Sequence, residues 1–127
     1  MPTDHEYQRL LAFRRRLRRF DQWSRAEAEA RGLTHAQHQL LLAIRGHDGP
    51  LPPTIGEIAD YLLVKHHTAS ELVERARALG LIERERDERD HRVIRLRLTD
   101  EGLRRLGHLT EVHLEELRRL APLLGEL

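Results

Sequence analysis

Apolar residues near the start of the chain recur three and four positions apart, the spacing that places side chains on one face of an α-helix. The first such series is Leu10, Phe13, Leu17, Phe20 and Trp23. Thr3 and Glu6 precede it in the T-x-x-E pattern of a capping box, and Gly32 follows it as a helix terminator. The pattern predicts one long helix from about Asp4 to Arg31.

A second helix is predicted directly afterwards. Thr34 and Gln37 repeat the capping pattern, and the helix runs to about Arg45. Residues 39–44 are apolar on nearly all sides, which places this helix in the core. The next segment, 46–53, holds most of the prolines and reads as a loop in which Leu51 forms a one-residue bridge to a small sheet.

The segment from Thr54 to Gly80 predicts two short helices joined by a tight turn. Thr54 and Glu57 form a third capping box, before a helix that ends near Leu62. Residues 63–65 form the turn, and the next helix runs from about 66 to 79 before Gly80 stops it. Two helices joined in this way form a helix-turn-helix.

A β-hairpin is predicted next. Residues 81–86 read as a strand, residues 87–92 as a charged loop, and residues 93–98 as a second strand. In the second strand Ile94, Leu96 and Leu98 alternate with Arg95 and Arg97, so the apolar side chains face inward and both arginines outward. Two short strands around a charged tip make a wing.

One more long helix follows, capped by Thr99, with Asp100 and Glu101 near the positive end of its dipole. Its seam at heptad spacing is Leu103, Leu106, Thr110, His113, Leu117, Leu120 and Leu124. Pro122 is expected to end or kink the helix near Leu120.

A helix-turn-helix with a wing is expected to bind nucleic acid on physical grounds, because the second helix fits a major groove and the wing tip reaches an adjacent minor groove. The candidate contacts on or beside that helix are Lys65, His66, His67, Thr68, Ser70, Glu71 and Arg75. The first half of the helix is expected to read bases, and the free amides at its start suit a phosphate.

Composition narrows the function. The net charge of +1 means that any basic surface must come from clustering, and Arg14 to Arg19 form either a solvated helix face or a phosphate contact. The absence of cysteine excludes disulfides and zinc–thiolate sites. No apolar run is long enough to span a bilayer and no signal peptide is recognisable, so a soluble, cytoplasmic protein is expected.

The segment from Leu33 to Gly102 resembles the MarR family of winged-helix regulators. The features that carry the resemblance are Gly32-Leu33-Thr34 with Gln37, Ile58-Ala59 with Leu62, Thr68-Ala69-Ser70 with Leu72-Val73-Glu74-Arg75, Gly80-Leu81-Ile82, and Asp87-x-Arg89-Asp90-x-Arg92 before Leu98-Thr99-Asp100-Glu101-Gly102. Their order and spacing cover more than half of the chain.

The resemblance implies a mainly α fold with a small β-hairpin wing, in which N- and C-terminal dimerisation helices flank a winged helix-turn-helix domain. The single domain, 1–127, then divides into a dimerisation helix (1–32), a core (33–99) and a second dimerisation helix (100–127). The implied function is that of a prokaryotic, homodimeric repressor that binds a pseudo-palindromic operator and is released by a small anionic or phenolic effector.

Residue by residue, the resemblance makes Arg92, with Arg89 as a second candidate, the wing arginine of the minor groove, braced by Asp87 and Asp90. Glu71 departs from the family pattern, because an acid at this place repels phosphate. The apolar stripes of the two long helices supply a symmetric interface, unless they pack on each other within one subunit.

Other chemistry is less well supported. His35 and His38 lie one turn apart without a clear third ligand, so no metal site or cofactor is predicted, although a metal-responsive regulator stays an alternative. No nucleophile–base pair or phosphate-binding glycine loop is present, so an enzyme is not expected. Trp23, His38 and His113 are the expected lining of an effector pocket, with ordinary core packing as the alternative. A winged-helix protein-interaction module without DNA binding is the remaining alternative.

Overall fold

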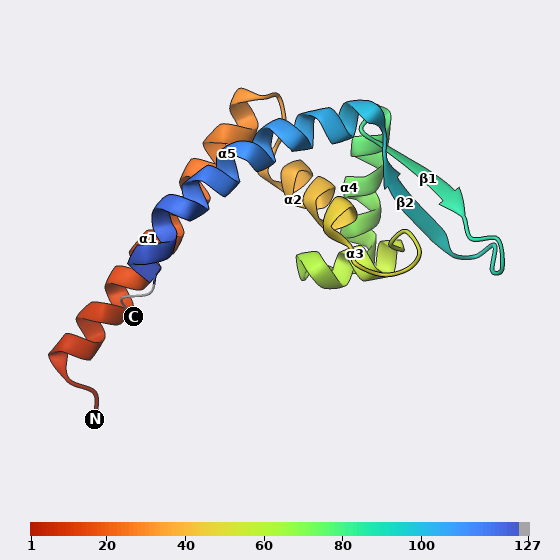
Figure 1. Cartoon of the computed structure of the whole chain (residues 1–127). Helices are drawn as coiled ribbons and strands as arrows, with labels where there is room; N and C mark the ends of the chain where they lie inside the picture. The colour runs from red at the N-terminus through yellow and green to blue at the C-terminus, as the bar shows by residue number, and fades with distance from the viewer. Residues whose placement is uncertain (125–127) are drawn as a thin grey trace.

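The computed structural model describes residues 1–124 of the chain; the side chain of Leu124 and residues 125–127, the end of the predicted C-terminal segment, lie outside the described part. Five helices and two strands follow one another (Figure 1). Their bounds are α1 Asp4–Ala30, α2 His35–Gly46, α3 Ile55–Leu62, α4 His66–Ala78, β1 Ile82–Arg86, β2 Ile94–Leu98 and α5 Asp100–Leu124.

The two long helices form an arm, and the other elements form a compact head. Figure 1 shows α1 and α5 side by side in opposite directions, with α2, α3 and α4 grouped near the start of α5 and the hairpin projecting from that group. The N-terminal part of α1 extends beyond the end of α5. This arrangement leaves one face of α4 and the tip of the hairpin free to meet a partner.

Capping boxes define where the first three helices begin. The hydroxyls of Thr3, Thr34 and Thr54 each accept a hydrogen bond from the backbone N–H three residues later, at 3.0–3.2 Å. In return, the side chains of Glu6, Gln37 and Glu57 accept the backbone N–H of each threonine. Reciprocal bonds of this kind satisfy amides that a helix otherwise leaves unpaired.

The core joins all the elements of the head to the arm. Its fully buried side chains include Leu40 and Leu41 of α2, Ile58 of α3 and Val73 of α4. Leu96 of β2 and Leu109 of α5 complete it. Gly102 lets α5 approach this core, because a Cβ at this position would lie 2.0 Å from the Leu81 carbonyl oxygen.

The sheet is a two-stranded antiparallel hairpin in which Ile82 pairs with Leu98 and Arg86 with Ile94. The loop before α3 joins it through an isolated bridge between Thr54 and Arg95, and the Leu96 N–H donates to the Pro53 carbonyl at 2.9 Å. The expectation that Leu51 makes this bridge was wrong. The bridge falls at Thr54 because the strand register brings Arg95 beside the start of α3.

The last helix continues through Pro122 to Leu124, so the expected end near Leu120 was also wrong. A proline this close to a helix end removes a hydrogen bond from the last turns only, where few remain to be lost. Arg16 of α1 donates from Nη1 to the Leu123 carbonyl at 3.0 Å, which satisfies one of the terminal acceptors.

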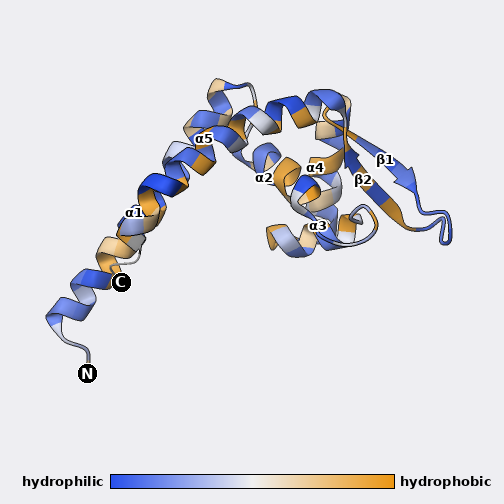
Figure 2. Ribbon diagram, in the orientation of Figure 1, coloured by the Kyte–Doolittle hydropathy of each residue, from blue (hydrophilic) through white to orange (hydrophobic). Residues whose placement is uncertain are grey.

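The fold class predicted from the sequence is confirmed, with N- and C-terminal helices flanking a winged head. No helix within residues 1–124 is long and apolar enough to cross a membrane. Figure 2 shows apolar residues along the arm as well as in the head. The large apolar side chains that are exposed on the arm helices are Tyr7, Leu10, Leu11, Leu17, Leu103, Leu114 and Leu117.

Candidate nucleic-acid interface

Helix α4 buries one face and exposes the opposite one. Ala69, Val73 and Ala76 are fully buried and fix the helix against α2, α3 and β1. The predicted contact residues lie elsewhere on the helix: His66, His67, Glu71 and Arg75 are exposed, and Thr68 and Ser70 are half-buried. Lys65, the residue before the helix, is also exposed.

The start of α4 has no side-chain cap, unlike α1, α2 and α3. Lys65 is the N-cap residue in extended conformation, and its side chain makes no capping hydrogen bond. The first backbone N–H groups of α4 therefore keep their donor capacity, and the positive end of the helix dipole lies beside an exposed lysine. Such an arrangement favours an anion.

One of the two acids of α4 is neutralised. Glu74 accepts from Arg77 at 3.0 Å and from Arg84 of β1 at 2.6 Å. The hydrogen bond from Arg77 is the main cause that lowers the pKa of Glu74. The Arg84 contact also links α4 to the wing. The Glu71 carboxylate has no hydrogen bond or ion pair with any residue in the described part of the chain.

The part of the wing next to its loop is held by an ion pair that links three segments. Arg95 donates from Nε to Asp87 Oδ1 at 2.6 Å and from Nη1 to the Pro52 carbonyl at 2.8 Å. The side chains of Arg95 and Asp87 are only 18% and 13% exposed. Arg95 lies on the outward side of the strand, as predicted, but its side chain is largely covered, because the loop before α3 packs over this part of the strand.

The tip of the wing is ordered by two aspartates. Asp87 Oδ2 accepts the backbone N–H groups of Arg89 and Asp90, each at 3.0 Å. Asp90 in turn accepts both the backbone N–H of Arg92 and its guanidinium, at 3.0–3.2 Å. These bonds lower the pKa of both carboxyls, chiefly through Arg95 for Asp87 and through Arg92 for Asp90.

The two aspartates that were expected to brace Arg92 have different contacts in the structure. Asp90 contacts Arg92 directly, whereas Asp87 contacts Arg95 and the backbone of the tip instead of the Arg92 side chain. The Arg92 side chain remains 91% exposed despite its ion pair. The Arg89 guanidinium has no hydrogen bond or ion pair within residues 1–124.

A small cleft brings the start of α4 and the wing together. It has a volume of about 260 Å³ and is lined by Thr54, Ile55, Gly56, His66, Arg92, Val93 and Ile94. His66 is the first residue of α4, and Arg92 is the expected minor-groove arginine. The fold thus places the uncapped helix start and the wing arginine on one surface.

A second cluster lies where α1, α2 and α5 meet. The ring centroid of His113 is 4.7 Å from those of both Trp23 and His38. His113 Nδ1 donates to the Leu109 carbonyl at 2.7 Å, so its Nε2 accepts from the Ser24 hydroxyl, also at 2.7 Å. The three residues expected to line an effector pocket are therefore neighbours.

The cluster is packed closely, and the nearby open space lies on the Trp23 side. A cleft of about 310 Å³ there is lined by Arg16, Arg19, Phe20, Trp23, Glu116, Arg119, Leu120 and Leu123. His38 is buried, and its Nδ1 has no hydrogen-bond partner. Burial, followed by the charges of His113 and His35, lowers the pKa of His38 to about 4.

The histidines do not form a metal centre in the described structure. Within residues 1–124, no group of three or more His, Asp or Glu side chains is arranged to hold a metal ion. His38 is buried and His35 half-buried, and the Nδ1 atom of each is buried without a hydrogen-bond partner.

Comparison with known proteins decides the family. The sequence model of the MarR family matches residues 31–93, the stretch from the end of α1 to the end of the wing loop. The chain belongs to the MarR family. None of the curated proteins compared with it gives a significant match.

Solved structures share the fold over nearly the whole MarR-family chain. AbsC, a MarR family transcriptional regulator from Streptomyces coelicolor, has a TM-score of 0.79 at 21% identity, covering 94% of this chain and 80% of AbsC. YusO from Bacillus subtilis has a TM-score of 0.67 at 26% identity, covering 94% and 83%. The S. aureus MepR–DNA complex has a TM-score of 0.72 at 22% identity, covering 100% and 86%.

Sequence analysis did not identify two residues of these sites, Ser24 and Arg95. Ser24 is a buried polar residue on the packed face of α1, and its bond to His113 spans 89 positions of the chain. Arg95 looked like an ordinary solvent-facing strand residue. Its spacing of eight residues from Asp87, across a hairpin, was a signal that the two side chains can meet.

Proposed function

We propose that this MarR-family chain is a sequence-specific, DNA-binding transcriptional regulator. Helix α4 enters the major groove and the wing tip reaches the adjacent minor groove. The observation that carries the proposal is the shared cleft of His66 and Arg92, which puts the uncapped start of α4 beside the wing arginine. A DNA backbone that passes between them meets amide donors from one side and a guanidinium from the other.

The proposed contacts divide by role. Lys65, His66 and Arg75 contact phosphates, and His67, Thr68, Ser70 and Glu71 face base edges from the exposed side of α4. Arg92 and Arg89 enter the minor groove. Most of these residues are exposed, which supports their contact with DNA, because a side chain buried in the core cannot reach it.

The regulator acts as a homodimer on a pseudo-palindromic operator. The exposed apolar side chains of α1 and α5 support this, since Leu10 and Leu11 are more than half exposed on a helix that extends beyond its intramolecular partner. A two-fold interface made from this surface buries it and sets the spacing between two copies of α4. Part of the α5 seam is already used within the subunit, where Leu106 is buried.

The dimer is a ligand-responsive repressor that works in the prokaryotic cytoplasm. The cleft beside Trp23 supports binding of a small anionic or phenolic effector, because it combines an aromatic wall with the guanidinium group of Arg19, whereas Arg119 is paired with Glu116 in the same lining. It lies next to the junction of α1, α2 and α5. A ligand bound there can change the angle between the arm and the head.

The decisive experiment is selection of bound sequences from a random DNA pool, followed by titration of the selected duplex at several salt concentrations. The proposal predicts a two-fold symmetric site and an affinity that falls steeply with salt, because bound phosphates release their counterions. Failure to enrich any sequence, or an affinity that does not change with salt, would contradict the proposed function. Either result would favour a protein-interaction module.

The effector is tested separately with salicylate as the probe. Trp23 is the only tryptophan of the chain, so its fluorescence reports directly on the cleft. Saturable quenching together with weaker operator binding supports the ligand-responsive role. Quenching without any change in DNA affinity would show a binding site that does not regulate.

A further inference from the structure

We infer that Glu71 reads the amino group of a cytosine in each half of the operator and thereby helps to set the sequence specificity of the protein. This inference rests on the proposed DNA-binding function and names a determinant of its specificity. It starts from an apparent conflict, because an exposed carboxylate on a helix that approaches DNA is repelled by phosphates.

The position of Glu71 places it on the part of α4 that approaches a groove first. The buried stripe of the helix is Ala69, Val73 and Ala76. Glu71 lies one turn after His67 on the opposite, exposed side, in the second turn of the helix. Side chains from the first turns of a recognition helix are the ones that contact base edges.

Three acids of α4 and the wing are paired with arginines, whereas Glu71 is not. Glu74, one turn away, is held by Arg77 and Arg84. Asp87 and Asp90 on the wing are held by Arg95 and Arg92. Glu71 has no ion pair within residues 1–124, not even with Arg75, which follows it by one helical turn. Its carboxylate therefore keeps its full capacity to accept hydrogen bonds.

The major groove offers few partners to a carboxylate. Guanine presents two acceptors there, and thymine presents one acceptor and a methyl group, so neither can donate to Glu71. Adenine presents an amino group, but the adjacent N7 acceptor repels a carboxylate. Cytosine presents an amino group without a neighbouring acceptor on the same base. A cytosine contact is therefore the arrangement that best offsets the repulsion by the backbone.

The test repeats the DNA selection with the full-length wild type, Glu71→Gln and Glu71→Ala. The wild type should enrich a C·G pair at one position in each half-site and lose roughly 5- to 100-fold in affinity when that pair is changed to T·A. Glu71→Gln should shift the preference at this position to adenine, which an amide recognises by two hydrogen bonds. Glu71→Ala should bind C·G and T·A duplexes equally.

A matched control comes from the neutralised acid. Glu74→Ala removes a carboxylate from the same exposed face but should leave the base preference unchanged. Because Glu71 is exposed and unpaired, its variants should unfold at the wild-type temperature, and a thermal melt verifies this.

The outcomes separate the two proposals. A wild type that selects a symmetric site, together with Glu71 variants that keep its preferences, overturns the cytosine contact and leaves the DNA-binding function standing. A wild type that selects no sequence overturns both. A preference at the cytosine position that changes equally in Glu74→Ala also overturns the assignment, because general charge near the groove would then explain it.

Discussion

Arg95 and Asp87 form an ion pair within the wing, and Arg95 also holds the wing to the rest of the head. Their Nε and Oδ1 atoms lie 2.6 Å apart, and the same guanidinium reaches the Pro52 carbonyl before α3. The other oxygen of Asp87 accepts the backbone of Arg89 and Asp90. A continuous path of hydrogen bonds therefore runs from the α2–α3 loop to the tip that carries Arg92.

The first prediction concerns this path. Arg95→Ala removes the link to Pro52 and the main partner of Asp87, so the wing tip should become more mobile. Hydrogen exchange at the amides of Arg89 and Asp90 should accelerate, and operator binding should weaken roughly tenfold, the equivalent of one lost positioning contact. Arg95→Lys should restore little, because one ammonium cannot occupy both branches of the guanidinium fork.

The neighbouring arginine of the same strand is the control. Arg97 pairs with Glu85 on the surface, and both side chains are more than half exposed. Arg97→Ala should leave the exchange of the tip amides unchanged, since exposed pairs contribute little. If Arg95→Ala and Arg97→Ala had equal effects, the positive charge of the strand would explain the weaker binding, and the path of hydrogen bonds to the wing tip would not.

The same ion pair shows where sequence reasoning reaches its limit. Strand alternation correctly placed Ile94, Leu96 and Leu98 on one side and both arginines on the other. It carries no information about which segment covers the outer side, because the α2–α3 loop is more than 40 positions away. Leu51 was misplaced as the bridge for the same reason: a bridge depends on long-range register.

Local patterns were much more informative. Three T-x-x-E/Q boxes marked the starts of α1, α2 and α3, because both hydrogen bonds of a capping box are made within four residues. The recognition helix and the wing followed from periodicity and from the charged hexapeptide. The neighbourhood of Trp23, His38 and His113 was expected from the meeting of three helices, whereas the buried Ser24 contact depended on details of packing.

The second prediction tests the wing arginine. Arg92→Ala should weaken operator binding strongly while leaving the dimer intact, because the side chain is 91% exposed and lies outside the core. The slope of log affinity against log salt should fall by about one if Arg92 neutralises one phosphate equivalent. Fluorescence anisotropy at several salt concentrations measures both effects.

Arg104→Ala is the matched control for Arg92→Ala. Arg104 is also an exposed arginine paired with an acid, Glu101, but it lies on α5 outside the proposed DNA-facing surface. It should leave both the affinity and the salt slope unchanged. An Arg92 variant that binds as tightly as the Arg104 variant would remove the wing from the interface.

The third prediction concerns acid stability. His38 has a pKa of about 4 in the folded protein against 6.5 as the ordinary value, so the unfolded chain takes up a proton first as the pH falls. Its contribution is complete above pH 6.5 and is lost progressively toward pH 4. The free energy of unfolding should fall by about 2 kcal/mol between pH 7 and pH 5 on this account.

Denaturant titrations at several pH values measure this loss. His38→Gln removes the titrating group and should flatten the pH dependence over this range, whatever its effect on absolute stability. His108→Gln, at an exposed histidine of α5, should leave the slope unchanged. A His38→Gln variant with the wild-type slope would assign the pH dependence to other groups. The acids with lowered pKa values lose their contribution only at lower pH.

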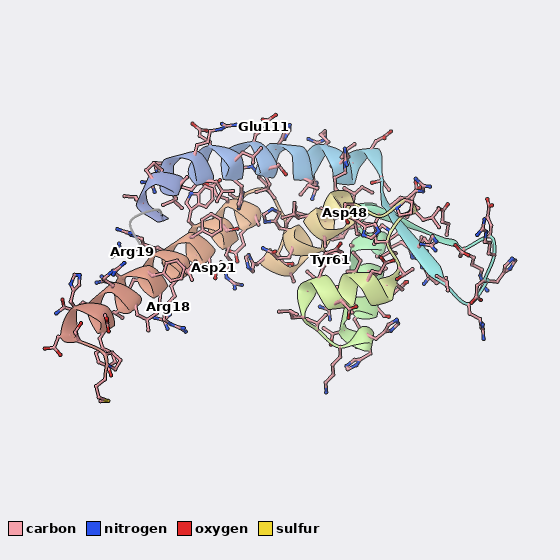
Figure 3. The ribbon with its side chains drawn as sticks, turned by 60° about the horizontal axis from the view of Figure 1, so that its bottom comes forward. Arg18, Arg19, Asp21, Asp48, Tyr61 and Glu111 are labelled. Atoms are coloured by element: carbon pink, nitrogen blue, oxygen red, sulfur yellow. The ribbon has the colours of Figure 1, made fainter. Side chains whose placement is uncertain are left out.

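The fourth prediction concerns the turn between α3 and α4. Leu63 has a φ of 56° and a ψ of 43°, the left-handed conformation, and its side chain is 91% exposed. Tyr61, visible at the end of α3 in Figure 3, is also more than half exposed. Leu63 carries backbone strain, because a residue with a Cβ is disfavoured in the left-handed conformation. The exposed Leu63 side chain buries almost no apolar surface that could offset this strain.

Leu63→Gly should therefore stabilise the fold by about 0.5–1 kcal/mol, because relief of the strain exceeds the extra entropy that glycine gives the unfolded chain. Leu63→Ala keeps a Cβ in the same conformation and should gain little.

Gly80, with a φ of 74° and open space around a Cβ, provides the reverse test: Gly80→Ala should destabilise by about 1 kcal/mol. A Leu63→Gly variant that is less stable than the wild type would contradict this prediction, because the entropy that glycine adds to the unfolded chain would then exceed the strain that is relieved. Denaturant titrations of the three variants and the wild type measure these differences in the free energy of unfolding.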